Sequence, residues 1–311
     1  MHKAEKKKLF NIEKLDEIHC IKEDYRIDPM IILKKEFSFA VGLENGSIKI
    51  YSRRYPYDFQ LELKIHSDFV ISIYESKLKE LISGSEDAKI KITIYDLKEK
   101  KYQILKTLSD HSKCINKIIG LKPIFGFDLF ASCSDDKRIR IWNKKAYQSI
   151  QIIKNSSEIF DLLEISNNRI IYCYVYGGLF VIHYKRGNIK KINDNIGCTG
   201  TNGLCEIKSK NLIAISSHDN IYLIDNKNYE IKIIMSTGDS LFSNWCCYVL
   251  SDGSLISSGE GIFICHLNIE EGKSIETKII HYDNISSMIE IENKILVTCS
   301  YDKTVRFFKL V

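Results

Sequence analysis

The sequence predicts an all-β protein in which a small four-stranded sheet repeats seven times and the sheets stack around a ring. Three observations support this prediction: a regular repeat, strand-type alternation within each repeat, and a spare segment of strand length near the start. One turn position marks each unit: Asn45, Asp87, Asp136, Gly178, Asp219, Glu260 and Asp302. Subtracting neighbouring residue numbers gives steps of 41 or 42 residues and a single step of 49. Such a period is typical of repeat architectures and not of an ordinary α/β enzyme.

Within each unit, apolar and polar residues alternate as they do in β-strands. Residues 89–94 alternate Lys or Thr with Ile, which places the isoleucines on one face of a strand. Each interval has room for four strands, which in the second unit are expected at 69–74, 80–83, 89–95 and 102–108. A sheet of this size cannot bury its own faces, so the sheets are expected to stack on their neighbours around a ring.

The two ends of the sequence predict how the ring closes. The seventh unit stops at Val311 after its third strand, whereas Leu9–Leu15 has strand length and no unit of its own. We therefore expect Leu9–Leu15 to pair into the last sheet as its outer strand, which removes open sheet edges. No Pro-, Gly- or Ser-rich linker interrupts the repeat, so residues 1–311 are expected to form one domain, with residues 1–8 as a disordered tail.

The clearest units resemble a known family. They read LISGSEDAKIKI (81–92), FASCSDDKRIRIWN (130–143) and LVTCSYDKTVRFF (296–308). These residues resemble the WD-repeat (G-beta-like) β-propellers, and the resemblance covers essentially the whole chain. It implies a seven-bladed β-propeller of four-stranded antiparallel blades, closed by the N-terminal strand, that acts as a protein-interaction scaffold.

In that family a His, a Ser or Thr, an Asp and a Trp of one blade form a hydrogen-bonded tetrad. The matching positions in the second, third and seventh units are His66, Ser83, Asp87 and Tyr95; His111, Ser132, Asp136 and Trp142; and His281, Thr298, Asp302 and Phe308. Units four, five and six lack both the His and a clear Asp. The resemblance implies that these tetrads are structural.

The search for catalytic chemistry favours no enzyme. His, Ser and Asp are also the residues of a hydrolase triad, but a hydrolase needs one triad and these residues recur in three units. The glycine cluster at 197–203 and the Gly-Lys-Ser at 272–274 are incomplete as phosphate loops, and no zinc-protease or EF-hand pattern is present. We therefore expect no catalytic, cofactor or metal site.

Composition predicts a folded intracellular protein. The chain is 44% hydrophobic and 11% aromatic, and no apolar stretch approaches the length of a membrane span. Its ten cysteines are scattered without a C-x-x-C pair, so they are interpreted as core residues in a reducing compartment. A cytoplasmic location is expected, with the nucleus as the open alternative.

Two surfaces are candidates for partner binding. On the top face, where the resemblance places the loops that enter each first strand, the candidates are Phe69, Glu158, Phe242, Asn244, Trp245 and Asn284. Trp245 fits either an interface anchor or a core residue of a degenerate blade, and both interpretations stay open. Peptides or proteins of a multi-protein complex are the partners expected here.

On the opposite, bottom face, the loops between the third and fourth strands carry basic pairs. The candidates are Arg53, Arg54, Lys144 and Lys145, in a chain of net charge +5. One interpretation is that these cations keep the surface soluble. The alternative function is a ribonucleoprotein or anionic-surface protein, in which this basic crescent binds RNA, anionic lipid or an acidic protein segment.

Overall fold

The computed structural model describes residues 15–34, 37–124, 126–166, 168–174, 177–198, 202–217, 220–236, 244–259, 263–269 and 273–310. Within them the strands form seven four-stranded antiparallel sheets, which we number by their order in the chain. The first is β2 (Ile27–Leu33), β3 (Ser38–Leu43), β4 (Ser47–Ser52) and β5 (Phe59–Lys64). The second is β6 (Val70–Glu75), β7 (Leu81–Ser85), β8 (Ile90–Asp96) and β9 (Lys101–Leu108). The third is β10 (Ile115–Ile124), β11 (Phe127–Ser134), β12 (Arg138–Asn143) and β13 (Gln148–Lys154).

The remaining sheets repeat the same order of strands. The fourth is β14 (Ile159–Ile165), β15 (Arg169–Tyr174), β16 (Leu179–His183) and β17 (Asn188–Asn193). The fifth is β18 (Leu204–Ile207), β19 (Leu212–Ser217), β20 (Asn220–Asp225) and β21 (Ile231–Ser236), with a single 3₁₀ turn, η2 (Lys208–Lys210), after β18. The sixth is β22 (Asn244–Val249), β23 (Leu255–Gly259), β24 (Phe263–Asn268) and β25 (Lys273–Ile279). The seventh is β26 (Ile285–Ile291), β27 (Ile295–Ser300), β28 (Thr304–Lys309) and the N-terminal β1 (Asp16–Lys22).

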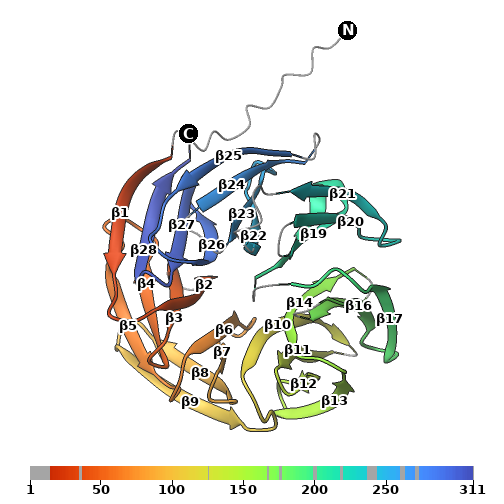
Figure 1. Ribbon diagram of the computed structural model, residues 1–311. Coiled ribbons are helices and arrows are strands. Elements are labelled where there is room, and N and C mark those ends of the chain that lie inside the picture. The colour runs from red at the N-terminus through yellow and green to blue at the C-terminus, as the bar shows by residue number, and fades with distance from the viewer. Residues whose placement is uncertain are drawn as a thin grey trace.

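The sheets are arranged in a circle with their first strands nearest the centre (Figure 1). Neighbouring first strands contact one another in sequence, and β26 of the seventh sheet contacts β2 of the first. The all-β class and the four-stranded antiparallel blades are thus confirmed. We call the face with the turns between second and third strands the top face, and the other the bottom face.

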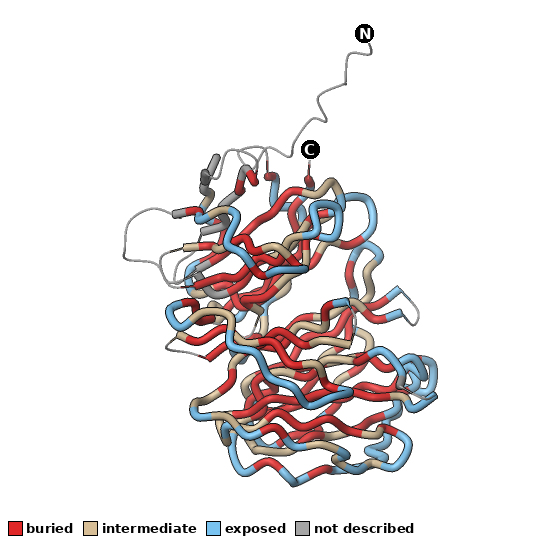
Figure 2. The backbone as a smooth tube through the Cα atoms, turned by 90° about the vertical axis from the view of Figure 1, so that its right-hand side faces the viewer, coloured by how far each residue is buried: buried red, intermediate tan, exposed pale blue. Residues whose placement is uncertain are grey.

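The hydrophobic core lies between the sheets and not inside any one of them. Each of seven clusters of buried side chains among the described residues joins two neighbouring sheets, and one of them joins the seventh sheet to the first. Buried residues follow the inner strands, whereas exposed residues gather on the turns and outer strands (Figure 2). The period-two alternation produces this core, because each inner strand sends one set of side chains to each neighbour.

The strand that completes the seventh sheet differs from the predicted one. It is β1, Asp16–Lys22, which pairs antiparallel with β28, and not Leu9–Leu15. Of the predicted segment only Leu15 lies within the described residues, where it is buried beside the seventh sheet. As an outer strand, β1 is largely open to solvent and carries an ion pair from Glu17 to Arg306, so its weak apolar pattern misled the sequence-based prediction.

The interpretation of every cysteine as a simple core residue is also wrong. Cys173 on β15 and Cys198, between β17 and β18, form a disulfide and are both fully buried. The segment that holds Cys198 folds back onto the fourth sheet, where the Cys198 N–H donates to the carbonyl of Tyr174. Because the two cysteines lie 25 residues apart, no local motif could have indicated the pairing.

Candidate interaction surfaces

The second, third and seventh sheets each hold a buried His hydrogen-bonded at both ring nitrogens. In the third sheet, His111 Nδ1 lies 2.8 Å from Asp136 Oδ2 and Nε2 lies 2.8 Å from Ser132 Oγ. The same pairs are 2.9 and 2.8 Å in the second sheet and 2.9 and 2.7 Å in the seventh. Because the Asp136 carboxylate can only accept, Nδ1 of His111 carries a proton and donates to it.

The aspartate of each triad also holds the turn between the second and third strands. Asp87 Oδ1 accepts from the N–H of Lys89 at 2.9 Å, around Ala88, which has a φ of 61°. Burial alone would raise the pKa of Asp87, but the hydrogen bond and charge of His66 lower it to about 2. The carboxylate is therefore fixed by the turn and by the imidazole together.

The aromatic residue of the tetrad differs from sheet to sheet, but it occupies the equivalent place in each. Trp142 Nε1 donates to Ser132 Oγ at 2.8 Å. Tyr95 and Phe308 are buried in the equivalent interfaces with the preceding sheet, as Trp142 is. Phe308 has no donor, so only packing is available to it there.

Polar side chains near the centre connect several sheets. Lys117 Nζ on β10 lies 2.6 Å from Asn202 Oδ1 and 3.5 Å from Asp161 Oδ1 on β14. The Asn202 amide donates to the carbonyl of Ser286 on β26 at 3.1 Å. Burial raises the pKa of Asp161 to about 6, although Lys117 opposes the rise. The segment that enters β18 thus fastens the third, fourth and seventh sheets to one another.

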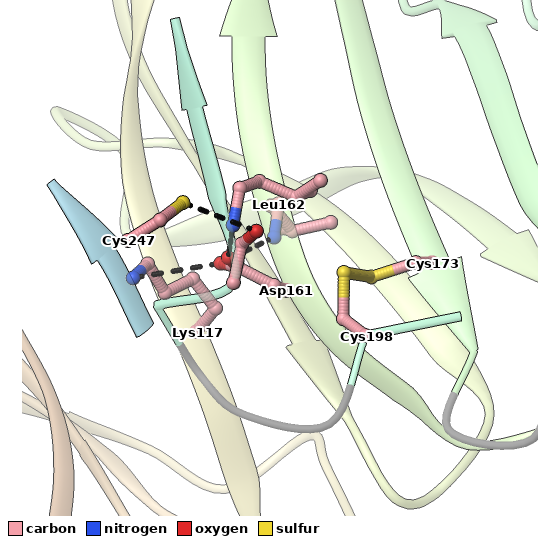
Figure 3. The surroundings of a disulfide bond; sticks show 8 residues. Lys117, Asp161, Leu162, Cys173, Cys198 and Cys247 are labelled. Carbon is pink, nitrogen blue, oxygen red and sulfur yellow. Dashed lines mark hydrogen bonds and ion pairs between the residues drawn. A yellow bond between two sulfur atoms is a disulfide. The ribbon is translucent and has the colours of Figure 1, made fainter. Parts of the chain in front are cut away.

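The disulfide belongs to the same segment. Figure 3 shows Lys117, Asp161 and Cys247 around the chain leading into β18, with the Cys173–Cys198 bond further back along it. Asp161 Oδ2 accepts from the N–H of Leu204 at 2.9 Å, so this carboxylate anchors the start of β18.

Phe69, a predicted partner-binding residue, is only 4% exposed. The Arg26 guanidinium lies 5.9 Å from the Phe69 ring and 5.4 Å from the Tyr301 ring, and it is held by Glu44 at 2.6 Å. This places Phe69 within a packed contact on the top face that joins the seventh, first and second sheets. An exposed aromatic anchor is not what the structure shows at this position.

A series of acidic residues begins beside that contact and extends towards Glu158, which precedes the fourth sheet. Burial raises the pKa of Glu86, and the neighbouring charges of Asp68 and Asp135 raise it further, against the lowering effect of Arg26. Burial likewise raises the pKa of Asp135, and Glu158 adds to the rise. These carboxylates, Asp68, Glu86, Asp135 and Glu158, make up what we call the acidic rim.

The other predicted top-face residues are spread around the ring. Glu158 is half-buried and lies 3.7 Å from Lys113 Nζ, and Asn284 is half-buried with its carbonyl accepting from the N–H of Tyr301. Asn244 and Trp245 belong to β22, but their side chains are not among those described, and Phe242 lies outside the described residues. The two interpretations of Trp245 therefore remain predictions.

Two of the four predicted bottom-face cations are used inside the molecule. Lys144 is 5% exposed and its Nζ lies 2.6 Å from Glu80 of the second sheet and 3.1 Å from Asp128. Arg53 reaches across to Glu292 beside the seventh sheet at 2.6 Å. Arg54 and Lys145 are exposed, and Arg54 lies 4.3 Å from the Phe37 ring. Half of the predicted basic set thus joins neighbouring sheets.

A set of glutamates that joins neighbouring sheets was not predicted from the sequence. The Glu75 carboxylate accepts from the N–H of Lys34 at 2.8 Å, which ties the second sheet to the first. Glu164 accepts from Lys122 at 2.7 Å, and Glu290 accepts from Ser251 at 2.6 Å. These three glutamates stand near the end of first strands, and their spacing follows the repeat, which was the available signal.

The part of the chain that the structure describes has neither a metal site nor a membrane-spanning helix. No group of three or more His, Cys, Asp or Glu side chains there is arranged to hold a metal ion. Among the same residues, no helix has the length and apolar character needed to cross a lipid bilayer.

Two regions of the chain are similar to a known family of repeats. Residues 102–143 and 272–309 match the family model described as "WD domain, G-beta repeat". The first match covers the third sheet's β10 to β12 with the preceding β9, and the second covers β25 to β28. These two regions are thus similar to WD repeats, and they lie in a fold of four-stranded antiparallel sheets with repeated His-containing triads.

Two curated relatives match short stretches of this chain. The chain is 40% identical over 65 residues to GID complex subunit 7 of Schizosaccharomyces pombe, which covers 21% of this chain and 12% of the relative. It is 32% identical over 68 residues to protein transport protein sec13 of Aspergillus clavatus, which covers 22% of this chain and 23% of the relative. The matched stretches thus span less than a quarter of either relative's length.

Proposed function

We propose that this chain is a non-catalytic protein-interaction scaffold whose top face binds a basic segment of a partner protein. The observation that carries the proposal is that the hydroxyl groups which resemble catalytic residues are buried and already hydrogen-bonded. Ser83, Ser132 and Thr298 are fully buried and hydrogen-bonded to their histidines, so their hydroxyls are committed within the sheets. The names of the two relatives, a complex subunit and a transport protein, support a role in an assembly.

The acidic rim indicates the chemistry of the partner. Like charges crowd Glu86 and Asp135 and raise the pKa of both carboxyls beyond what burial does. A Lys or Arg side chain placed among them would relieve this repulsion, so a cationic segment is favoured over an acidic one. Of the predicted residues, Phe69 packs beneath this surface, and Glu158 supplies one carboxylate of the acidic rim.

We also propose that the seven sheets are the blades of a single ring, and that the described residues form one domain. The support is the buried cluster between the seventh and first sheets together with the pairing of β1 with β28. In this arrangement the three His-containing triads are structural and take no part in binding.

Paired charge reversals test the proposed binding face. The top-face variant Asp68→Lys/Glu86→Lys should lose about tenfold or more of the partner protein that the wild-type chain captures from a lysate. The matched bottom-face variant Arg54→Glu/Lys145→Glu should retain it. Loss in the bottom-face variant with retention in the top-face variant would reject the proposal.

The alternative function, binding of RNA or an anionic surface by the basic crescent, has weaker support. Arg53 and Lys144 already hold carboxylates of neighbouring sheets, which leaves Arg54 and Lys145 as the exposed pair. Retention of RNA that weakens steeply with salt, and that disappears in the bottom-face variant, would favour this alternative instead.

A further inference from the structure

We propose that Cys205 and Cys247 form a second, oxidation-dependent disulfide that joins the fifth and sixth sheets. The two Sγ atoms lie 3.2 Å apart, and the cysteines are 42 residues apart in the chain. Cys205 belongs to β18 and Cys247 to β22, the innermost strands of their sheets. The bond would therefore cross the boundary between two sheets near the centre of the ring.

The backbone holds these two strands together beside the thiols. The Cys247 N–H donates to the carbonyl of Asn202 at 3.1 Å, and Asn202 also forms an isolated bridge with Cys246. The Cys247 thiol lies 3.5 Å from the carbonyl of Gly203. Because these contacts fix both strands next to the sulfur atoms, closing the bond requires only a short approach of the side chains.

The two thiols differ in their access to an oxidant. Cys205 is half-buried, whereas Cys247 is 6% exposed and packs with Ala214, Leu223 and Leu255. The hydrogen bond to Cys205, together with burial, raises the pKa of the Cys247 thiol. Cys205 is therefore the residue that meets a dissolved oxidant first, and Cys247 is the one that resolves the intermediate.

The oxidant is a low-molecular-weight disulfide such as oxidised glutathione. The Cys205 thiolate attacks one of its sulfur atoms, and one molecule of reduced glutathione leaves. Cys247 then loses its proton and attacks the Cys205 sulfur of the mixed disulfide, which releases the second glutathione. Two protein thiols are thus oxidised to one disulfide, and one glutathione disulfide is reduced to two thiols.

The new bond would extend the existing one. Cys198 already ties the segment before β18 to the fourth sheet through Cys173. With Cys205 bonded to Cys247, residues 198–205 would be covalently fastened at both ends, to the fourth sheet and to the sixth.

Peptide mapping of the full chain tests the proposal. Trypsin leaves Cys198 and Cys205 together in residues 192–208, and Cys247 with Cys246 and Cys265 in residues 233–273. After incubation with oxidised glutathione and alkylation of the remaining thiols, these two peptides should be linked without reduction. Incubation with dithiothreitol before alkylation should abolish the link, and oxidation should reduce the alkylation rate of Cys205 about tenfold or more.

Three serine variants assign the bond. Cys246→Ser is the matched control and should keep the link, because its thiol faces Ser258 on the other side of the strand. Cys205→Ser and Cys247→Ser should each lose it, while the link between residues 192–208 and the Cys173 peptide persists in both as evidence of folding. Absence of the link in the oxidised wild-type chain, or its persistence in either of those two variants, would overturn the proposal.

Discussion

At the scale of single residues, Ser132 illustrates how a buried hydroxyl is fully used. It lies 2.8 Å from His111 Nε2 and accepts from Trp142 Nε1 at 2.8 Å. Ser83 has the equivalent histidine of its own sheet, His66, as a partner at 2.8 Å, but the aromatic residue of its tetrad is a tyrosine. Ser132 Oγ therefore has an indole N–H among its partners, whereas Ser83 Oγ contacts His66 and, at the longer distance of 3.5 Å, the carbonyl of Lys91.

Ser132→Ala should cost about 3 kcal/mol of the free energy of unfolding, because the Trp142 N–H and the His111 ring nitrogen both lose a partner in the interior. Ser83→Ala should cost about half as much. Urea denaturation monitored by circular dichroism measures both, with the exposed Ser112→Ala as control. Equal losses for the two buried serines would contradict the assignment of the Trp142 hydrogen bond.

Asp28 on β2 should make stability depend on pH. Burial raises its pKa from an ordinary value of 3.8 to about 8, although Lys117 and a hydrogen bond from Tyr301 oppose the rise. The folded state thus keeps a proton that the unfolded chain releases. This contribution to stability is complete below the unfolded pKa of about 4 and is lost as pH rises to about 8.

The wild-type chain should therefore lose stability relative to Asp28→Asn between pH 5 and 8, by on the order of 1 kcal/mol per pH unit. Chemical denaturation of both proteins across this range supplies the comparison. A difference between them that stays constant with pH would show that Asp28 is already ionised in the folded state.

The residues of the triads could be picked out from the sequence because they recur with the repeat. Asp87, Asp136 and Asp302 stand at one marker position, and each lies within hydrogen-bond distance of its His. The roles of Phe69 and Lys144 could not be predicted, because their burial depends on partners such as Tyr301 and Glu80 in other sheets. A repeat pattern describes one blade and says nothing about which side chains meet across two.

At the scale of elements, ion pairs and carboxylate contacts join sheets that the apolar clusters already hold. Lys144 is the clearest case, since its side chain is 7% exposed and that of Glu80 is 11% exposed. A desolvated carboxylate that loses its only cation is costly, whereas an exposed lysine contributes little.

Lys144→Met should therefore lower the free energy of unfolding by about 3 kcal/mol, because it leaves Glu80 and Asp128 without their shared cation. The adjacent exposed Lys145→Met should change it by less than about 0.5 kcal/mol. Thermal and urea unfolding of the two variants provide the test. Similar small changes in both would mean that Lys144 is a surface residue after all.

The strands of the second sheet could be located from the sequence, whereas the strand that closes the ring could not. The second sheet has its strands at Val70–Glu75, Leu81–Ser85, Ile90–Asp96 and Lys101–Leu108, each within two residues of its predicted segment at either end. The closing strand was misplaced because β1 is polar on both sides of its few apolar residues. Outer strands need little burial, so alternation is a weak guide to them.

At the scale of the whole molecule, the first and last sheets meet where the two ends of the chain come together. The seventh sheet takes three strands from the end of the chain and one from its beginning. Beyond this pairing, buried side chains of β26 to β28 pack against those of β2 to β4. If both contacts form in solution, the first and last sheets cannot separate without exposing this cluster.

An engineered disulfide between β1 and β28 is the sharpest test of how the ring closes. Cys20 on β1 stands opposite Arg306 on β28 in the antiparallel register. The variant Arg306→Cys should cross-link to Cys20 on mild oxidation and should melt at a higher temperature oxidised than reduced, whereas Arg306→Cys/Cys20→Ser should do neither. Failure of the thiols at positions 20 and 306 to join in the folded chain would contradict a ring of sheets closed by its own N-terminal strand.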